Sequence, residues 1–143
     1  MCSFDGLPHH PIKMSVWSRA VHIATPEEFD EAVEAAAQRG KRVYVLLTGA
    51  ADGDTGMSWC GDCVRVVPGL SAALEREREG ELVVVEVARA AYRGNPEYGL
   101  RRHKGVRLAT VPTFGRWERG RLEMRLEEDQ IADPALLAEL LAP

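Results

Sequence analysis

The sequence predicts an α/β domain built on a central mixed β-sheet of about five strands flanked by helices. Short apolar runs rich in β-branched residues, the pattern of buried parallel strands, alternate with stretches of helical periodicity. Strand–helix–strand order of this kind is typical of parallel βαβ units. Near the C-terminus, two segments of alternating polarity flank Arg119-Gly120, which predicts an antiparallel hairpin and therefore a mixed sheet.

Five strands and four helices are expected in this order along the chain. The expected strands are residues 19–23, 43–47, 82–87, 113–117 and 121–127. The expected helices are residues 26–39, 60–79 and 97–103, and one that begins at Pro134.

Capping residues mark the helix boundaries. Thr25 is expected to cap the first helix, with Pro26 in its first turn and Glu28 closing a capping box, and Asp133 is expected to cap the last helix. The helix that begins at Cys60 is expected to turn an apolar side toward the core, formed by Val64, Val67, Leu70 and Leu74.

Length and composition bound the class of protein. The chain has 143 residues, enough for one domain, and we assign residues 1–18 to an irregular arm and residues 19–143 to the domain. A net charge of −4 without a basic stripe argues against nucleic-acid binding, and no apolar run approaches the roughly 18 residues of a membrane span. Three cysteines do not make a disulfide-stapled secreted scaffold, so we expect a cytoplasmic monomer.

Two cysteines three residues apart, Cys60 and Cys63, carry the clearest chemical signal. On the first turn of a helix, the Cys60 sulfur would face free backbone N–H groups and the positive end of the helix dipole, which favour thiolate. Cys60 would then attack a substrate disulfide, and Cys63 would resolve the mixed disulfide. We therefore expect the pKa of Cys60 to lie below the free value of about 8.5.

The competing interpretations of this pair are buried thiols without a chemical role and a zinc site. A zinc site would need two more ligands, and no second paired motif occurs at finger or ribbon spacing. The other available side chains are those of Cys2, His9, His10, His22 and His103. We therefore predict no metal site.

Three segments of the chain resemble the thioredoxin fold. They are Trp59-Cys60-Gly61-Asp62-Cys63 between strand and helix, Pro68 within that helix, and Thr110-Val111-Pro112-Thr113 before the hairpin. The closer resemblance is to the fourteen-kilodalton thioredoxin-related proteins, also called thioredoxin domain-containing protein 17. Those proteins carry Ser-Trp-Cys-Pro-Asp-Cys where this chain has Ser58 to Cys63, and the resemblance covers residues 19–143.

The resemblance implies a cytosolic protein-disulfide reductase with a thioredoxin-like fold. Its substrates would be disulfide-containing proteins or small molecules, and it would bind no cofactor, because its electrons arrive from thioredoxin reductase and NADPH. The resemblance also implies that Pro112 is cis and that its loop, with Val111, lies against the cysteine pair and shapes the substrate groove. Trp59, Gly61 and Asp62 are expected to tune access and the thiol pKa.

Two departures from the family pattern bear on the chemistry. Gly61 and Asp62 stand where the fourteen-kilodalton proteins and ordinary thioredoxins, respectively, have proline, and a carboxylate beside the thiols should hold back thiolate formation. The strand at residues 43–47 also lacks the aspartate that thioredoxins bury there to take the proton of the resolving thiol. Asp62 and Glu86 are the candidate replacements. The alternative function is a non-catalytic or weakly active adaptor that binds a partner through the same groove.

Overall fold

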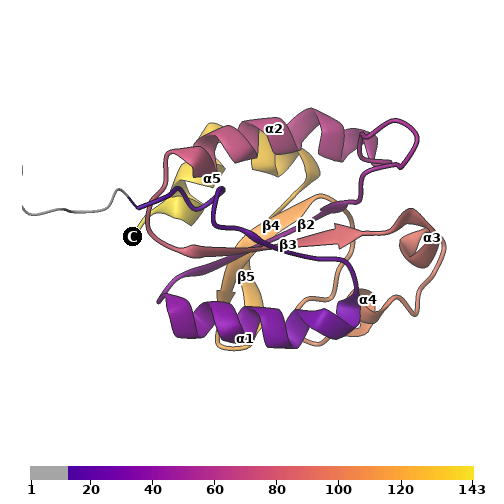
Figure 1. Ribbon diagram of the computed structural model, residues 1–143, viewed down its shortest axis with the longest axis horizontal. Coiled ribbons are helices and arrows are strands. Elements are labelled where there is room, and N and C mark those ends of the chain that lie inside the picture. Colours follow the sequence, from indigo (N-terminus) through magenta and orange to yellow (C-terminus); the bar gives the residue numbers. More distant parts are fainter. Residues whose placement is uncertain (1–12) are drawn as a thin grey trace, which may run out of the picture.

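The computed structural model describes residues 13–143, which form a five-stranded mixed β-sheet with helices on both faces (Figure 1). β3 pairs in parallel with β1 and β2, whereas β4 is antiparallel to both β2 and β5. The order in the sheet is β1-β3-β2-β4-β5, with bounds β1 Val21–Ile23, β2 Val43–Gly49, β3 Glu81–Val87, β4 Thr113–Glu118 and β5 Arg121–Glu127. The predicted α/β class and mixed sheet are confirmed.

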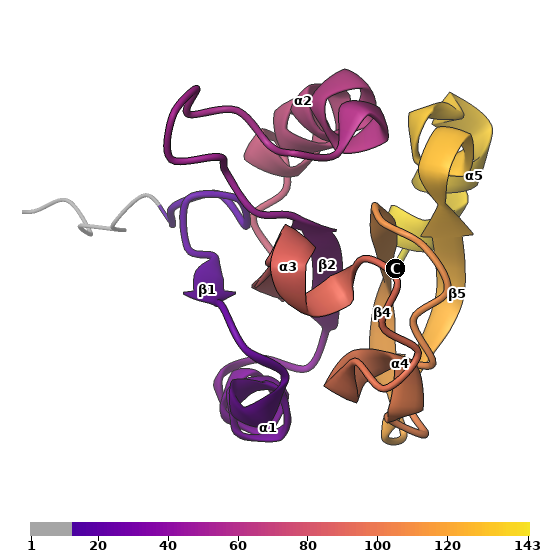
Figure 2. The same cartoon turned by 90° about the vertical axis from the view of Figure 1, so that its right-hand side faces the viewer.

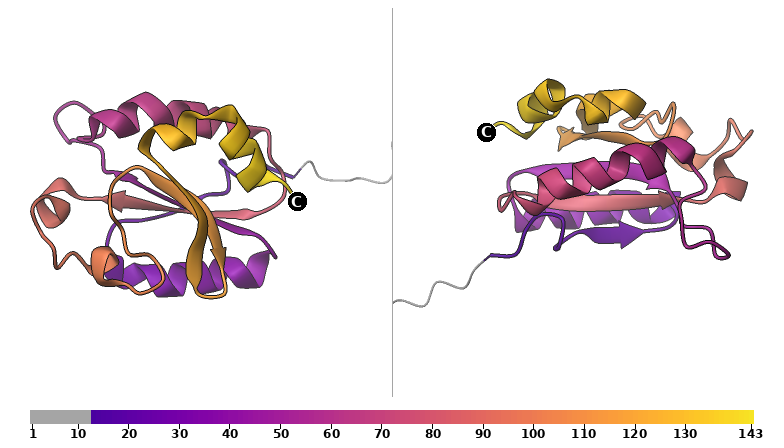
Figure 3. Two further views of the ribbon diagram at one scale, coloured as in Figure 1. Left: turned by 180° about the vertical axis from the view of Figure 1, so that it is seen from behind. Right: turned by 90° about the horizontal axis from the view of Figure 1, so that it is seen from above.

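Helices cover both faces of this sheet. On one face lies α1 (Phe29–Arg39), which follows the short 3₁₀ helix η2 (Pro26–Glu28). On the other face, α2 (Gly61–Glu75) and α5 (Pro134–Leu141) lie side by side (Figures 2 and 3). Three one-turn elements complete the domain: α3 (Arg89–Tyr92), α4 (Gly99–Arg102) and the 3₁₀ helix η3 (Glu128–Ala132).

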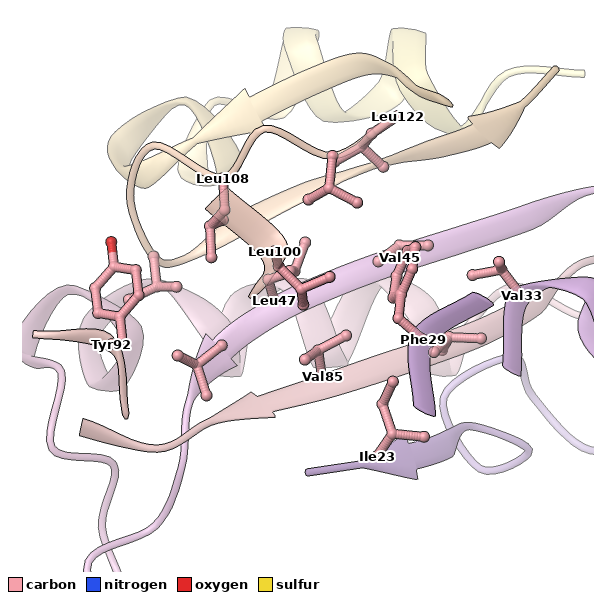
Figure 4. Close-up of a cluster of buried hydrophobic side chains, with 14 of the residues drawn as sticks. Ile23, Phe29, Val33, Val45, Leu47, Val85, Tyr92, Leu100, Leu108 and Leu122 are labelled. Atoms are coloured by element: carbon pink, nitrogen blue, oxygen red, sulfur yellow. The ribbon is translucent and has the colours of Figure 1, made fainter. Parts of the chain in front are cut away.

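Each face of the sheet has its own buried cluster, because side chains alternate along the strands. In β2, Val45 and Leu47 belong to the cluster on the α1 face, and Tyr44 and Leu46 belong to the cluster on the α2 face. Figure 4 shows the α1-face cluster, with labelled members Ile23, Phe29, Val33, Val45, Leu47, Val85, Tyr92, Leu100, Leu108 and Leu122. With apolar residues on both faces, β2 occupies the centre of the sheet, as predicted for residues 43–47.

Leu70, Leu74 and, in part, Val67 pack against the core as predicted for α2, but Val64 does not. Val64 is 37% exposed, whereas Val66, with Leu70 and Leu74, is buried. The buried stripe starts at Cys63 and follows helical spacing from there, so it passes through Val66. The helix also ends at Glu75 rather than at residue 79, and the chain after it contacts Val16 through the carbonyl oxygen of Glu77.

The N-terminal boundary of the domain also differs from the prediction. Residues 13–18 contain no helix or strand, but Ser15 is buried and Val16 is fully buried in the α2-face cluster. The N–H of Val16 donates to the carbonyl oxygen of Glu77 at 2.9 Å. The folded domain therefore begins before residue 19, and the rest of the predicted arm, residues 1–12, lies outside the described residues.

The C-terminal hairpin forms as predicted, with one irregularity. Arg119 and Gly120 both have positive φ, 53° and 76°, which suits a two-residue hairpin turn. The pairing of β4 with β5 shifts between Phe114 and Arg116, and Met124 is 42% exposed with a φ of 53°. A bulge therefore interrupts the polarity alternation expected in β5. The helix expected at residues 97–103 is the shorter α4.

Candidate active site

The cysteine pair lies where the chain passes from the C-terminal end of β2, through residues 50–59, into α2 (Figure 1). Cys60 is the N-cap residue of α2, in extended conformation, and its sulfur accepts the backbone N–H of Cys63 at 3.2 Å. This contact satisfies one of the free N–H groups of the helix N-terminus. The structure therefore brings the two predicted site residues together at the helix start.

Ser58 and Gly49 hold this turn, and the sequence analysis did not identify either. The Ser58 hydroxyl donates to the carbonyl oxygen of Gly49 at 2.7 Å and accepts the N–H of Cys60 at 3.1 Å. The N–H of Gly49 donates to the sulfur of Cys63 at 3.3 Å. A Cβ on Gly49 would lie only 2.8 Å from the Cβ of Cys60, so glycine allows strand and turn to approach.

Burial dominates the electrostatics of the two thiols. Cys60 is 7% exposed and Cys63 is 1% exposed. Burial, and next the side-chain hydrogen bond with Cys63, raises the pKa of Cys60 to about 12, while the Cys63 backbone N–H acts in the opposite direction. The expected pKa below the free value is therefore wrong in direction for the free reduced protein, because desolvation outweighs the helix N-terminus.

The Val111–Pro112 peptide bond is cis, as the resemblance implies, and its loop lies against the cysteine pair. The Cys60 thiol donates to the carbonyl oxygen of Val111 at 3.5 Å. The Thr113 hydroxyl donates to the carbonyl oxygen of Thr110 at 2.7 Å and fixes the loop from within. Val111 thus lies beside the Cys60 thiol, as predicted, and Pro112 is the next residue of the same loop.

A groove of about 500 Å³ opens over Cys60. Its lining includes Trp59, Gly61, Asp62 and Val111 from the predicted site, together with Tyr92 and Arg101. The Trp59 indole N–H donates to the carbonyl oxygen of Val87 at 2.7 Å, so the ring is anchored to the end of β3 while one part lines the groove. Packing and groove lining are therefore both roles of Trp59.

Tyr92 and Arg101 form the far wall of the groove. The guanidinium carbon of Arg101 lies 3.9 Å from the centre of the Tyr92 ring, a cation–π contact. The same Tyr92 ring lies 5.9 Å from the Trp59 ring. This stack holds the positive charge of Arg101 at the groove lining, and the sequence alone does not show this placement.

Asp62 and Glu86, the candidate proton acceptors, lie on different sides of the pair. Asp62 is ion-paired with Arg65 at 2.7 Å, and Arg65 also contacts Asp129 at 2.5 Å. Glu86 is on β3, ion-paired with His22 at 3.4 Å, and lines a separate cavity that reaches Cys63. Asp62 is thus tied to the groove side, and Glu86 to the opposite side.

Within the part of the chain that the structure describes, no three His, Cys, Asp or Glu side chains form a group that could hold a metal ion. No helix in residues 13–143 is long and apolar enough to cross a membrane.

Comparisons with known proteins identify relatives in sequence, a similar fold and the family of this chain. The "Thioredoxin-like protein Clot" of Arabidopsis thaliana is 36% identical over 107 residues, 73% of this chain and 79% of that protein. An "Acireductone dioxygenase" of Leishmania braziliensis is 37% identical over 78 residues, half of this chain (50%) but only 23% of that protein. This chain thus spans less than a quarter of the latter relative's length.

A solved structure shows the fold at low identity. It is titled "Crystal structure of ferredoxin: thioredoxin reductase and thioredoxin f2 complex" and matches with a TM-score of 0.57 and 16% identity, covering 90% of this chain and 96% of that one. The model of the family described as "Thioredoxin domain-containing protein 17-like, thioredoxin domain" matches residues 22–143. The chain belongs to this thioredoxin domain-containing protein 17-like family.

Proposed function

We propose that this protein is a thiol-disulfide oxidoreductase that reduces disulfides with the Cys60–Cys63 dithiol. The observation that carries the proposal is the place of the Cys60 sulfur. It accepts the Cys63 N–H at 3.2 Å and lies 3.5 Å from the carbonyl oxygen of Val111, within the lining of a groove. Membership of a thioredoxin-domain family supports the same chemistry.

The exchange has two steps. Cys60, as thiolate, attacks one substrate sulfur, forms a mixed disulfide and releases the other sulfur as a thiolate that takes up a proton. Cys63, as thiolate, then attacks the Cys60 sulfur, closes the Cys60–Cys63 disulfide and releases the second substrate thiolate, which is also protonated. Two electrons pass to the substrate, and the two protons lost by the dithiol equal the two gained.

The groove gives a substrate disulfide its place. Trp59 and Val111 flank the attacking sulfur, and Arg101 and Asp62 place one positive and one negative side chain on the groove lining. The groove has a volume of about 500 Å³, so it has room for either a protein segment or a small disulfide as substrate.

The oxidised dithiol must be reduced again after each turnover. We propose thioredoxin reductase, with NADPH as the electron source, as the donor, so that the protein itself needs no bound cofactor. The neighbour of this fold in a complex titled with ferredoxin:thioredoxin reductase supports a reductase as the class of partner. Such a cycle needs a reducing compartment, and we propose a cytosolic monomer.

One observation favours a second candidate, a non-catalytic or weakly active adaptor. Burial raises the pKa of Cys60 to about 12, which leaves little thiolate near neutral pH. An adaptor would hold a partner in the same groove without turning over disulfides.

Turnover of a protein disulfide, with and without a thioredoxin reductase and NADPH, tests the proposal. A Cys60→Ser variant should lose all turnover, and a Cys63→Ser variant should accumulate a mixed disulfide with the substrate. The midpoint potential should lie near or below the cytosolic poise of about −220 to −320 mV. The adaptor would be established instead if the wild-type protein turned over no disulfides and bound a partner as tightly as the Cys60→Ser variant does.

A further inference from the structure

A second cavity, of about 330 Å³, reaches the resolving thiol from the side opposite the groove. Thr48, Met57, Cys63, Val67 and Glu86 are among its lining residues. None of the residues that line the groove over Cys60 also lines this cavity. The two thiols are therefore approached through separate openings.

Within residues 13–143, the Cys63 sulfur has a backbone N–H donor but no carboxylate or imidazole as a hydrogen-bond partner. Its sulfur is 1% exposed and accepts the N–H of Gly49 at 3.3 Å, a contact that stabilises negative charge on sulfur. Resolution requires the Cys63 proton to leave, because only the thiolate attacks. In the strand beneath, Leu46 is fully buried and apolar, and β2 carries no carboxylate.

Glu86 is the carboxylate that the fold places at this cavity. Val85 and Val87 belong to the α1-face cluster, so Glu86 between them points to the opposite face of β3, next to Thr48 of β2 in register. Among the described residues that line this cavity, Glu86 and Cys63 are the two with ionisable side chains. Among residues 13–143, the charged side chain paired with Glu86 is His22 of β1, at 3.4 Å.

We propose that Glu86 accepts the proton of the Cys63 thiol across this cavity when Cys63 resolves the mixed disulfide. The inference rests on the proposed dithiol chemistry. The proton passes from sulfur to carboxylate through water, for which a cavity of this size has room since one water occupies about 30 Å³. The sulfur electron pair then forms the bond to Cys60, and Glu86 returns its proton to solvent.

Glu86 and its ion-pair partner His22 are both open to solvent. Both side chains are about half exposed, 50% for His22 and 42% for Glu86, so the proton can exchange with bulk water. Glu86 thus acts on the second step, whereas the groups around Cys60 act on the first.

Single turnover with dithiobis-nitrobenzoate separates the two steps. Attack by Cys60 releases one coloured nitrothiobenzoate, and attack by Cys63 releases the second. The experiment uses full-length reduced protein with Cys2→Ser, so that only the dithiol reacts. Glu86→Gln should leave the first release unchanged and slow the second about tenfold near pH 7, a modest general-base effect. The slowing should disappear at high pH, where hydroxide from solvent replaces the carboxylate as the base.

The matched control is Glu31→Gln, an exposed glutamate of α1 remote from the cavity, which should alter neither release. Glu86→Asp should restore part of the second rate. An unchanged second release in Glu86→Gln, or a slowing that is equal at every pH, overturns the role of Glu86 while leaving the dithiol reaction intact. Absence of the second release in the Cys2→Ser protein itself overturns the proposed function, and the inference with it.

Discussion

The backbone N–H of Gly49 donates to the sulfur of Cys63 at 3.3 Å, which ties the last residue of β2 to the Cys63 thiol. The contact is possible because strand and turn approach closely: a Cβ on Gly49 would lie 2.7 Å from the Ser58 hydroxyl oxygen and 3.0 Å from the Trp59 ring. Any side chain at this position must displace the turn that carries both cysteines.

Gly49→Ala should therefore lower the free energy of unfolding by about 2–3 kcal/mol, the cost of overpacking a close contact. Disulfide turnover should fall by more than tenfold, because the turn shifts. Gly53→Ala is the matched control, since a Cβ there meets nothing within 4 Å, and it should change stability by less than about 0.5 kcal/mol. Chemical unfolding and turnover assays measure both. Equal effects of the two substitutions would contradict the role of Gly49.

Asp62→Asn should shift the alkylation profile of Cys60 to lower pH. The charge of Asp62 is one of the causes that raise the pKa of Cys60, after burial and the Cys63 thiol, so its removal favours the thiolate. Since Arg65 already neutralises part of that charge, we expect a decrease of about half a pKa unit. Rates of iodoacetamide alkylation against pH measure it in the Cys63→Ser background. An unshifted or higher profile would show that the carboxylate is not coupled to the thiol.

Tyr98→Phe should stabilise the protein by about 1 kcal/mol, because it removes a buried polar group that lacks a partner. The Tyr98 hydroxyl is buried and, within residues 13–143, has no hydrogen-bond partner. Denaturant unfolding at pH 8 measures the gain. A loss of stability there would mean that the hydroxyl has a partner in solution.

The same variant should respond differently to alkaline pH. Burial, and next the charges of Glu27 and Tyr92, raises the pKa of Tyr98 from 10.0 to about 12. A folded-state pKa above the unfolded value gives stability that is complete below pH 10 and is lost as the pH rises toward about 12. The advantage of Tyr98→Phe should therefore grow between pH 10 and about pH 12, and a constant difference would contradict the shift.

Val66→Ala should cost about 2 kcal/mol and Val64→Ala less than about 0.5 kcal/mol, because only Val66 leaves a cavity in the core. Val66 is 3% exposed, whereas Val64 is 37% exposed on the same helix. Thermal or denaturant unfolding of the two variants makes the comparison. The opposite order would mean that α2 is rotated about its axis.

The strands and the cysteine turn were predictable because their signals are local. An apolar run such as residues 43–47 indicates a buried strand by itself, and the spacing of Cys60 and Cys63 places both sulfurs at one helix start. The prediction of Val64 on the buried side of α2 was wrong, since Val64, Val66 and Val67 are equally apolar and only packing decides among them. The inclusion of Val16 in the core likewise depends on a contact with a distant segment.

The electrostatics of the site were the least predictable part. A helix N-terminus lowers a thiol pKa in isolation, but Cys60 is also buried against Val111, 51 residues further along the chain. Desolvation of that kind depends on tertiary contacts that no local pattern records. The support from Gly49 was hidden for the same reason, because a glycine at a strand end looks like an ordinary loop start.

Gly61 offers a contrast to Gly49. It is the first residue of α2, exposed, and a Cβ built on it meets no atom within 4 Å. The residue between the two sulfurs can therefore be exchanged, even for proline at this first helical position, without repacking the interior. Selection or design can therefore change the reduction potential of the dithiol by substituting Gly61, while the rest of the fold stays the same.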